Sequence, residues 1–437
     1  MPLYEGDVSD YTAPRSSQVT RLVVEVARST AESGVRAVVA RLDGELAETS
    51  VLTVPALDSA APESVRIRLR TSTGDGAASE EAGRRLFAAL FSGPLSRVWA
   101  RTVRKTQESG NQQEPGGLEL VIDSDDPVVQ ALPWELLFDP VVPSGYVVLR
   151  DRWSVIRRRL RTSPQVDPLR PEALKVLVLT ANLARSVRDK DQVIVRAALP
   201  QARVEVVEAT SVDAALTAIR STPHHILHVA SIGERARNAQ ALLVGNAKEV
   251  GRLTGKDIAA ALPGPPRIAM LACSESDLVA AELAQHIPAV IGMRGTISPD
   301  GCDAFLRGLY TALASGSSVG RAVGAGRAQQ LSFSNSFGDE WSLPVAFLSR
   351  NTDQLVEAGE LTAAARLDET GPVQLAPVNV QLLQMKTANL QAMRAQWDPY
   401  KVNAVPPFIR THIAALERDI AALEREVDEL KRRTGAA

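Results

Sequence analysis

The sequence predicts an α/β fold whose sheet is mainly parallel and flanked by helices. Between residues 174 and 349, short apolar runs alternate with stretches in which apolar residues recur at helical spacing. The first run, LKVLVLTAN at 174–182, is continuously apolar, as expected for a strand buried on both faces of a parallel sheet. Beyond about residue 355 the chain becomes polar and helical. We therefore expect a sheet-based body followed by a C-terminal helical segment.

The first 165 residues predict an N-terminal α/β region. Residues 1–18 are polar and are expected to form a loose arm. Val-rich and apolar runs predict the strands, and apolar residues at helical spacing predict the helix. Strands are expected at 21–28, 35–42 and 118–123, and a helix at 79–91. A proline-rich stretch at 161–172 is expected to link this region, 1–165, to the next.

Residues 170–350 predict the principal domain, in which strands and helices alternate. Strands are expected at 174–182, 204–209, 224–230, 267–273, 289–294 and 343–349. Helices are expected at 186–199, 212–221, 276–287, 301–315 and 318–331. Because the strands are expected to be parallel, their carboxyl ends should meet at one edge of the sheet.

The bulk composition limits the possible partners and locations. The net charge of −2 over 437 residues gives no electrostatic footprint for nucleic acid or for an anionic membrane. Cys273 and Cys302 are the only two cysteines, too few for a disulfide-built secreted protein. The acidic N-terminus does not resemble a signal peptide, and no apolar run is long enough for a membrane span. The cytoplasm is the expected location.

Five segments, taken in order, resemble the CHAT family, whose members are similar in fold to caspases and separases. The segments are LPWELLFDP (132–140), RIAMLACSES (267–276), ELAQHIPAVIGMRGTIS (282–298), AFLRGLYTALASGSSVGRAVGAGRAQQL (304–331) and WSLP (341–344). The resemblance covers roughly residues 20–350 and implies a caspase-like α/β domain over residues 170–350, with 1–165 as an associated α/β region. It also implies a cysteine-peptidase dyad, in which a His-Gly pair follows one strand and a cysteine ends the next.

The histidine of that dyad is replaced in this chain. The family pattern is His-x-x-x-His-Gly, with the second histidine as general base, and here the segment runs from His228 to Ile232 and Gly233. Cys273 occupies the nucleophile position. Ile232 can neither lower the pKa of a thiol nor protonate a leaving amine, and general acid–base help is worth about 10²–10⁴-fold. The chain is therefore expected to be a catalytically inactive pseudo-peptidase.

Three functions remain open. The first is an inactive scaffold in a bacterial defence or signalling complex, which binds an active peptidase or its substrate. The second is an active cysteine endopeptidase in which His228 replaces the missing base for Cys273. The third is a sensor that binds a small ligand at the carboxyl ends of the strands. Cys273 itself is interpreted either as a small buried apolar residue or as a nucleophile position that binds without cleaving.

The remaining candidate residues carry no predicted chemistry. His224 and His225 begin a strand, His286 ends a helix, and His412 lies in the C-terminal segment. The spacing of histidines and cysteines predicts no metal site, and no cofactor is expected. The glycines of the last two helices have no strand before them to form a phosphate loop, and are expected to allow close helix packing. These are Gly316, Gly320, Gly324 and Gly326.

The C-terminal segment, 355–437, predicts a partner-binding helix. Its apolar residues step alternately by three and four, with β-branched residues at a and leucines at d, a pattern that favours a parallel two-stranded coiled coil. Residues 379–397 predict a second helix before the Pro406-Pro407 break, so an intramolecular hairpin is an equal alternative to a homodimer. The partner-binding seam consists of Ile413, Leu416, Ile420, Leu423, Val427 and Leu430.

Overall fold

The computed structural model of the chain divides it into two compact units, Met1–Gly359 and Glu360–Ala437. All described residues belong to the first unit, so the predicted coiled coil, its partner-binding seam and His412 lie outside them, as does the predicted arm at 1–18. The structure describes residues 19–27, 35–53, 76–110, 116–141, 145–150, 152–158, 168–181, 185–221, 223–236, 239–245, 250–333, 339–349 and 356–357.

Within the described residues, eleven strands form one sheet in the order β3-β2-β1-β4-β5-β14-β13-β12-β8-β6-β7. The strands are β1 (Val19–Val26), β2 (Val35–Leu42), β3 (Glu45–Thr53), β4 (Gly117–Asp123), β5 (Trp153–Arg158), β6 (Lys175–Thr180), β7 (Arg203–Glu208), β8 (Ile226–Ala230), β12 (Ile268–Ala272), β13 (Ala289–Met293) and β14 (Pro344–Leu348). Most neighbours pair in parallel, and the antiparallel pairs are β1 with β2, β2 with β3 and β13 with β14. The predicted, mainly parallel α/β sheet is confirmed.

The sheet continues through the boundary expected near residues 165–170. β5, from the N-terminal region, pairs in parallel with β14, from the last part of the principal domain. The two predicted regions therefore share one sheet and one compact unit. The proline-rich stretch joins two halves of a sheet and does not separate two bodies, because the final strand returns to the middle of the sheet.

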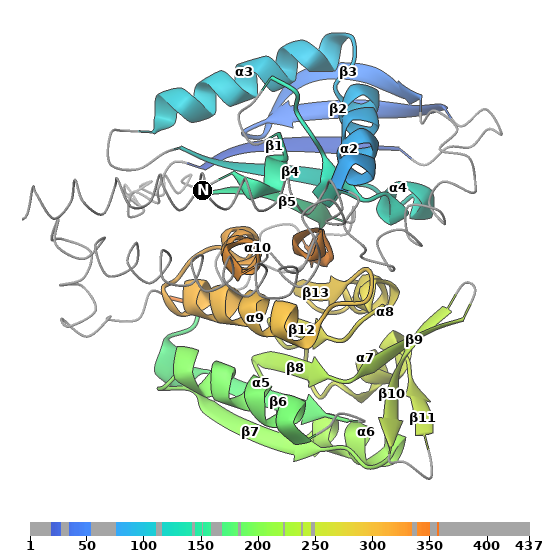
Figure 1. Cartoon of the computed structure of the whole chain (residues 1–437), viewed down its shortest axis with the longest axis vertical. Helices are drawn as coiled ribbons and strands as arrows, with labels where there is room; N and C mark the ends of the chain where they lie inside the picture. Colours follow the sequence, from blue (N-terminus) through green and yellow to red (C-terminus); the bar gives the residue numbers. More distant parts are fainter. Residues whose placement is uncertain are drawn as a thin grey trace, which may run out of the picture. The chain divides into compact units, whose positions relative to one another are not determined.

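Helices cover both faces of the half of the sheet that contains β6, β8 and β12 (Figure 1). The helices are α2 (Gly76–Leu90), α3 (Pro94–Ser109), α4 (Pro127–Ala131), α5 (Arg185–Ala198), α6 (Val212–Ser221), α7 (Gly255–Ala261), α8 (Asp277–Leu283), α9 (Pro299–Ala314) and α10 (Val319–Phe333). Short 3₁₀ turns are η1 (Trp134–Leu136), η2 (Val147–Leu149), η3 (Pro171–Ala173) and η5 (Glu340–Ser342). None of the described helices has the length and apolar run that crossing a bilayer requires.

Alternating residues of these strands enter two different cores. Met270 of β12 packs in the larger core together with side chains of α5, α9 and α10. Leu271, its neighbour, packs in the second core with side chains of α6, α7 and α8. Successive side chains of a strand point to opposite faces of the sheet, so the two cores mark its two sides. This separation decides which functional side chains can meet.

A small antiparallel sheet follows directly after β8. It consists of β9 (Ile232–Ala236), β10 (Ala239–Gly245) and β11 (Val250–Leu253), in the order β11-β10-β9. Figure 1 shows these strands beside the end of β8. The sequence analysis did not predict this sheet, and it also missed α3 and α7.

Two of the four glycines named above, Gly320 and Gly326, allow close packing, as predicted. A Cβ on Gly326 of α10 would lie 2.6 Å from the ring of Phe305, and one on Gly320 would lie 2.8 Å from a carboxylate oxygen of Glu119. Gly324 has looser surroundings, with its nearest atom at 3.3 Å. Gly316 does not lie on a helix but follows α9 with a φ of 78°, a left-handed conformation that favours glycine.

Replacing Gly308 of α9 by Ala is expected to destabilise the chain by about 1–3 kcal/mol. The new methyl would lie 2.5 Å from the Ala325 carbonyl oxygen on α10, so the two helices must move apart. This cost outweighs the gain of about 1 kcal/mol that Ala brings to a helix interior. Urea unfolding measures the effect, with Gly324→Ala as the matched control. Equal stability of the two variants would contradict the close helix contact.

Candidate active site at the carboxyl ends of β8 and β12

The structure brings the predicted nucleophile position, Cys273, and the segment that leads to Ile232 to the same edge of the sheet. β8 and β12 pair in parallel, with Ala230 opposite Ala272 as the last residue of each strand. Cys273 therefore follows β12 at the level where the chain leaves β8 toward Ile232. The Cys273 Sγ lies 3.2 Å from the carbonyl oxygen of Val229.

The thiol of Cys273 is enclosed. The residue is 1% exposed and its side chain belongs to the second core. Burial raises the pKa of the Cys273 thiol far above its usual range, and a hydrogen bond from the Ser231 backbone N–H offsets this only in part. A reactive cysteine needs a lowered pKa and some access to solvent, so this environment favours the neutral thiol.

Ile232 begins β9 and is 46% exposed. It follows Ser231 directly, so it lies one residue from the backbone N–H that contacts the thiol. Gly233 packs tightly beside the loop that follows the cysteine, because a Cβ there would lie 1.8 Å from the Ser274 carbonyl oxygen. Close packing against this loop is therefore a steric reason for a glycine at position 233.

His228 lies on the other side of the sheet from Cys273. It pairs with Met270 and Val178, whose side chains belong to the larger core. Its ring is fully buried, with Nε2 3.1 Å from Asp191 Oδ2 and Nδ1 2.8 Å from the Tyr310 hydroxyl. Both ring nitrogens are thus engaged away from the thiol.

The other described histidines also lie away from Cys273. His225 precedes β8, and its carbonyl oxygen accepts the backbone N–H of Ile268 at the start of β12. His224 and His225 therefore lie at the opposite edge of the sheet, as predicted. Burial lowers the pKa of both imidazoles. His286 is exposed after the end of α8. No imidazole of the described residues lies beside the Cys273 thiol.

The loop after Cys273 is fixed by its serines. Ser276 Oγ donates to the Cys273 carbonyl oxygen at 2.7 Å and accepts the Met293 N–H at 3.0 Å. Ser274 Oγ accepts the Ile297 N–H at 3.2 Å. Between the two serines, Glu275 has a φ of 55°, in the left-handed region. The segment Cys-Ser-Glu-Ser is thus a rigid connection tied to the end of β13.

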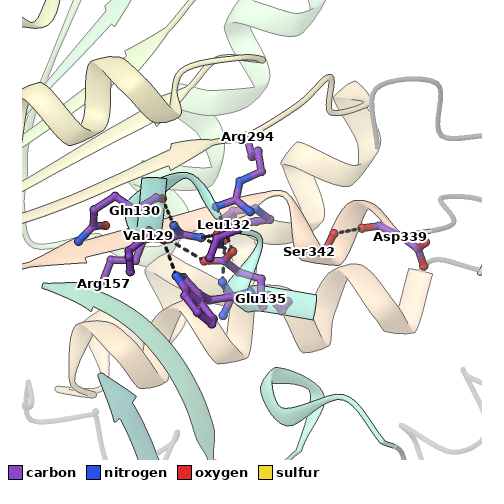
Figure 2. A network of polar contacts seen from close by, with 11 residues as sticks. Val129, Gln130, Leu132, Glu135, Arg157, Arg294, Asp339 and Ser342 are labelled. Carbon is purple, nitrogen blue, oxygen red and sulfur yellow. Dashed lines mark hydrogen bonds and ion pairs between the residues drawn. The ribbon is translucent and has the colours of Figure 1, made fainter. Parts of the chain in front are cut away.

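A buried ionic network around Glu135 was missed by the sequence analysis. Glu135, from the PWELL segment on η1, is fully buried, and Arg157 Nη2 of β5 lies 2.6 Å from its Oε2 (Figure 2). Arg294, which follows β13, lies 3.3 Å from the same oxygen. Arg157 Nη2 also donates to the Leu132 carbonyl oxygen at 2.8 Å. The one signal in the sequence was a glutamate inside an apolar, proline-bounded run.

The charges of these arginines set the protonation of Glu135. Burial by itself pushes the pKa of Glu135 up, but Arg157, Arg294 and Arg327 together hold this pKa below its usual value. The carboxylate is therefore ionised and joins η1 to β5 and to the segment after β13. Because Arg294 follows β13, the network fixes the strand end next to that of Cys273.

The chain is similar in sequence to one protein family and in structure to a solved proteinase. Residues 80–336 match the sequence model of the CHAT domain family. The match begins inside the region 1–165, so that region contributes to the family's domain. No curated protein matches the chain. Among solved structures, the chain is similar to the Arg-specific cysteine proteinase gingipain R, with a TM-score of 0.39 and 10% identity, over 60% of this chain and 70% of that one. The match to the family model spans more than half of the sequence, and the chain therefore belongs to the CHAT domain family.

Proposed function

We propose that this chain is a peptidase-related module that works by binding other proteins and does not hydrolyse peptides. The observation that carries the proposal is the enclosed Cys273 thiol, beside which no imidazole of the described residues lies. A cysteine peptidase needs a base to form the thiolate and an acid to protonate the leaving amine. Among the described residues, no imidazole is placed to take either role at this edge of the sheet.

The alternative peptidase, with His228 as the base, would need a large rearrangement. The ring would have to leave Asp191 and Tyr310 and pass from one core to the other through a continuous sheet. Such a move would break two buried hydrogen bonds and leave their partners unsatisfied. We therefore assign His228 a structural role, in which it ties β8 to α5 and α9.

For the binding partner we propose a class of protein. It comprises proteins of the same bacterial defence or signalling system, in the cytoplasm, including an active peptidase or its substrate. The C-terminal heptad seam, from Ile413 to Leu430, stays a prediction for the partner surface because it lies outside the described residues. The third alternative, a small-ligand sensor, has no specific observation in its favour.

The alkylation rate of Cys273 tests this proposal. At pH 7 the native thiol is expected to react with iodoacetamide roughly 100-fold or more slowly than in the urea-unfolded chain, because burial shifts a pKa by up to about 3–5 units. Peptide mapping by mass spectrometry separates Cys273 from Cys302, which is the internal control, since it is buried and its thiol pKa is also raised.

A peptidyl chloromethyl ketone gives the decisive comparison. The proposal expects Cys273 to react with it no faster than Cys302, and it expects Cys273→Ala to leave any residual peptide cleavage unchanged. Selective and rapid labelling of Cys273, lost in His228→Ala, would show an atypical peptidase and overturn the proposal.

A further inference from the structure

The ionic network around Glu135 has a third arginine whose contacts are incomplete. Arg327 of α10 is fully buried, and its Nη2 donates to the Pro344 carbonyl oxygen at 2.7 Å. Its Nε and Nη1 are buried and have no hydrogen-bond partner among the residues that the structure describes. Three guanidinium groups, those of Arg157, Arg294 and Arg327, act on the single carboxylate of Glu135.

Burying a guanidinium group without a full set of hydrogen-bond acceptors is energetically unfavourable. Burial lowers the pKa of Arg327 to about 10, the charge of Glu135 offsets part of this, and the charge of Arg157 adds to it. A buried cation is normally balanced by an anion, and a buried N–H normally has an acceptor. Among the described residues, Arg327 has a peptide carbonyl for one nitrogen and no acceptor for the two others. The carboxylate that acts on it, Glu135, already pairs with Arg157 and Arg294.

Gln330 adds an independent observation at the same place. It lies three residues after Arg327 on α10, so the two side chains leave the same face of the helix. Gln330 is fully buried, and within the described part of the chain both its Nε2 and its Oε1 lack a hydrogen-bond partner. A buried amide without partners is rare and destabilising. Its N–H₂ group would complete a set of donors with Arg327 Nε and Nη1.

We propose that Arg327 and Gln330 hold a small monovalent anion of the halide class, represented by chloride. The donor set is cationic at Arg327 and neutral at Gln330, which suits a single negative charge. Both side chains are fully buried, which favours a small spherical ion over a larger oxyanion. The weakly hydrated guanidinium loses little on pairing with such an ion. A water molecule beside the anion would serve Gln330 Oε1, which accepts and does not donate.

Bromide is the probe for this site. The full chain is purified without halide, and its thermal midpoint is compared in sodium bromide and in sodium gluconate at equal ionic strength. Bromide at about 200 mM is expected to raise the midpoint by about 2–5 °C, because an ion that binds only the folded state stabilises it. Anomalous diffraction from a bromide-soaked crystal is expected to show a peak within hydrogen-bond distance of Arg327 Nε.

Two variants and a control assign the effect to this place. Arg327→Met is expected to lose the bromide dependence, and Arg307→Met, which removes an exposed arginine from α9, is expected to keep it. Gln330→Glu keeps the shape and supplies a carboxylate beside Arg327. Gln330→Glu is expected to raise the thermal midpoint in gluconate and to abolish the effect of bromide. If Arg327→Met does not fold, Gln330→Glu by itself tests whether the anion binds here. No anomalous peak, or a bromide effect unchanged in Gln330→Glu, would show that water alone fills the site and would overturn the proposal.

Discussion

Replacing Glu135 by Ala is expected to lower the free energy of unfolding by about 3–5 kcal/mol, the range for breaking a buried ion pair from one side. The loss is large because Arg157, which is fully buried, and Arg294, which is 3% exposed, would then lack their shared carboxylate. Urea unfolding followed by tryptophan fluorescence measures it. Glu81→Ala is the matched control, since Glu81 pairs with Arg85 on the surface of α2 and should change stability by about 0.5 kcal/mol or less.

The same carboxylate gives a pH dependence of known sign. The folded-state pKa of Glu135 lies below its unfolded value, so its contribution is complete above the unfolded pKa, about 4.3, and is lost as the pH falls through the folded pKa. Glu135→Gln, which keeps the shape but not the charge, should therefore lose less stability than the native chain on acidification below about pH 4. A Glu135→Ala variant within about 1 kcal/mol of the native chain would contradict the network's structural role.

Replacing Ile232 by His is expected to speed the alkylation of Cys273 by about 10–100-fold at pH 7. Position 232 follows the residue whose N–H contacts the thiol, and an imidazolium near a thiol lowers its pKa by about 1–3 units. The thiol of this variant is expected to stay less reactive than the nucleophile of an active peptidase, because Cys273 remains buried in the second core.

The control for this variant lies on the same hairpin. Leu243 of β10 is the cross-strand partner of Ile232, so Leu243→His places an imidazole on the neighbouring strand. It is expected to change the rate by less than about twofold, since the charge on this partly exposed side chain is screened by solvent. If Ile232→His reacts no faster than Leu243→His, the side chain at 232 does not reach the thiol. The assignment of Ile232 to the family's histidine position would then be wrong.

Much of the fold could be predicted because its signals are local. The apolar runs that became β6, β7, β8, β12, β13 and β14 are short, rich in branched residues and bounded by helical stretches, so each identifies a strand without its neighbours. The helix expected at 212–221 has the same limits in the structure. The three-stranded sheet of β9, β10 and β11 was missed for two reasons. The first strand, β9, contains polar residues such as Glu234 and Arg235, and the pairing of the strands depends on partners across the turns.

For the candidate site, the sequence by itself determined the residue types and their approximate place: a cysteine after one strand, an Ile-Gly pair after its neighbour, and strand ends that meet at one edge. Only the tertiary structure decided which side chains meet. The register of β8 against β12 pairs His228 with Met270, and since side chains alternate, it sends His228 and Cys273 to opposite faces. The arginine network joins positions 135, 157, 294 and 327, and arginine is a residue that composition alone assigns to the surface. Strand identity is a property of a few consecutive residues, whereas register, burial and charge pairing depend on segments that only folding brings together.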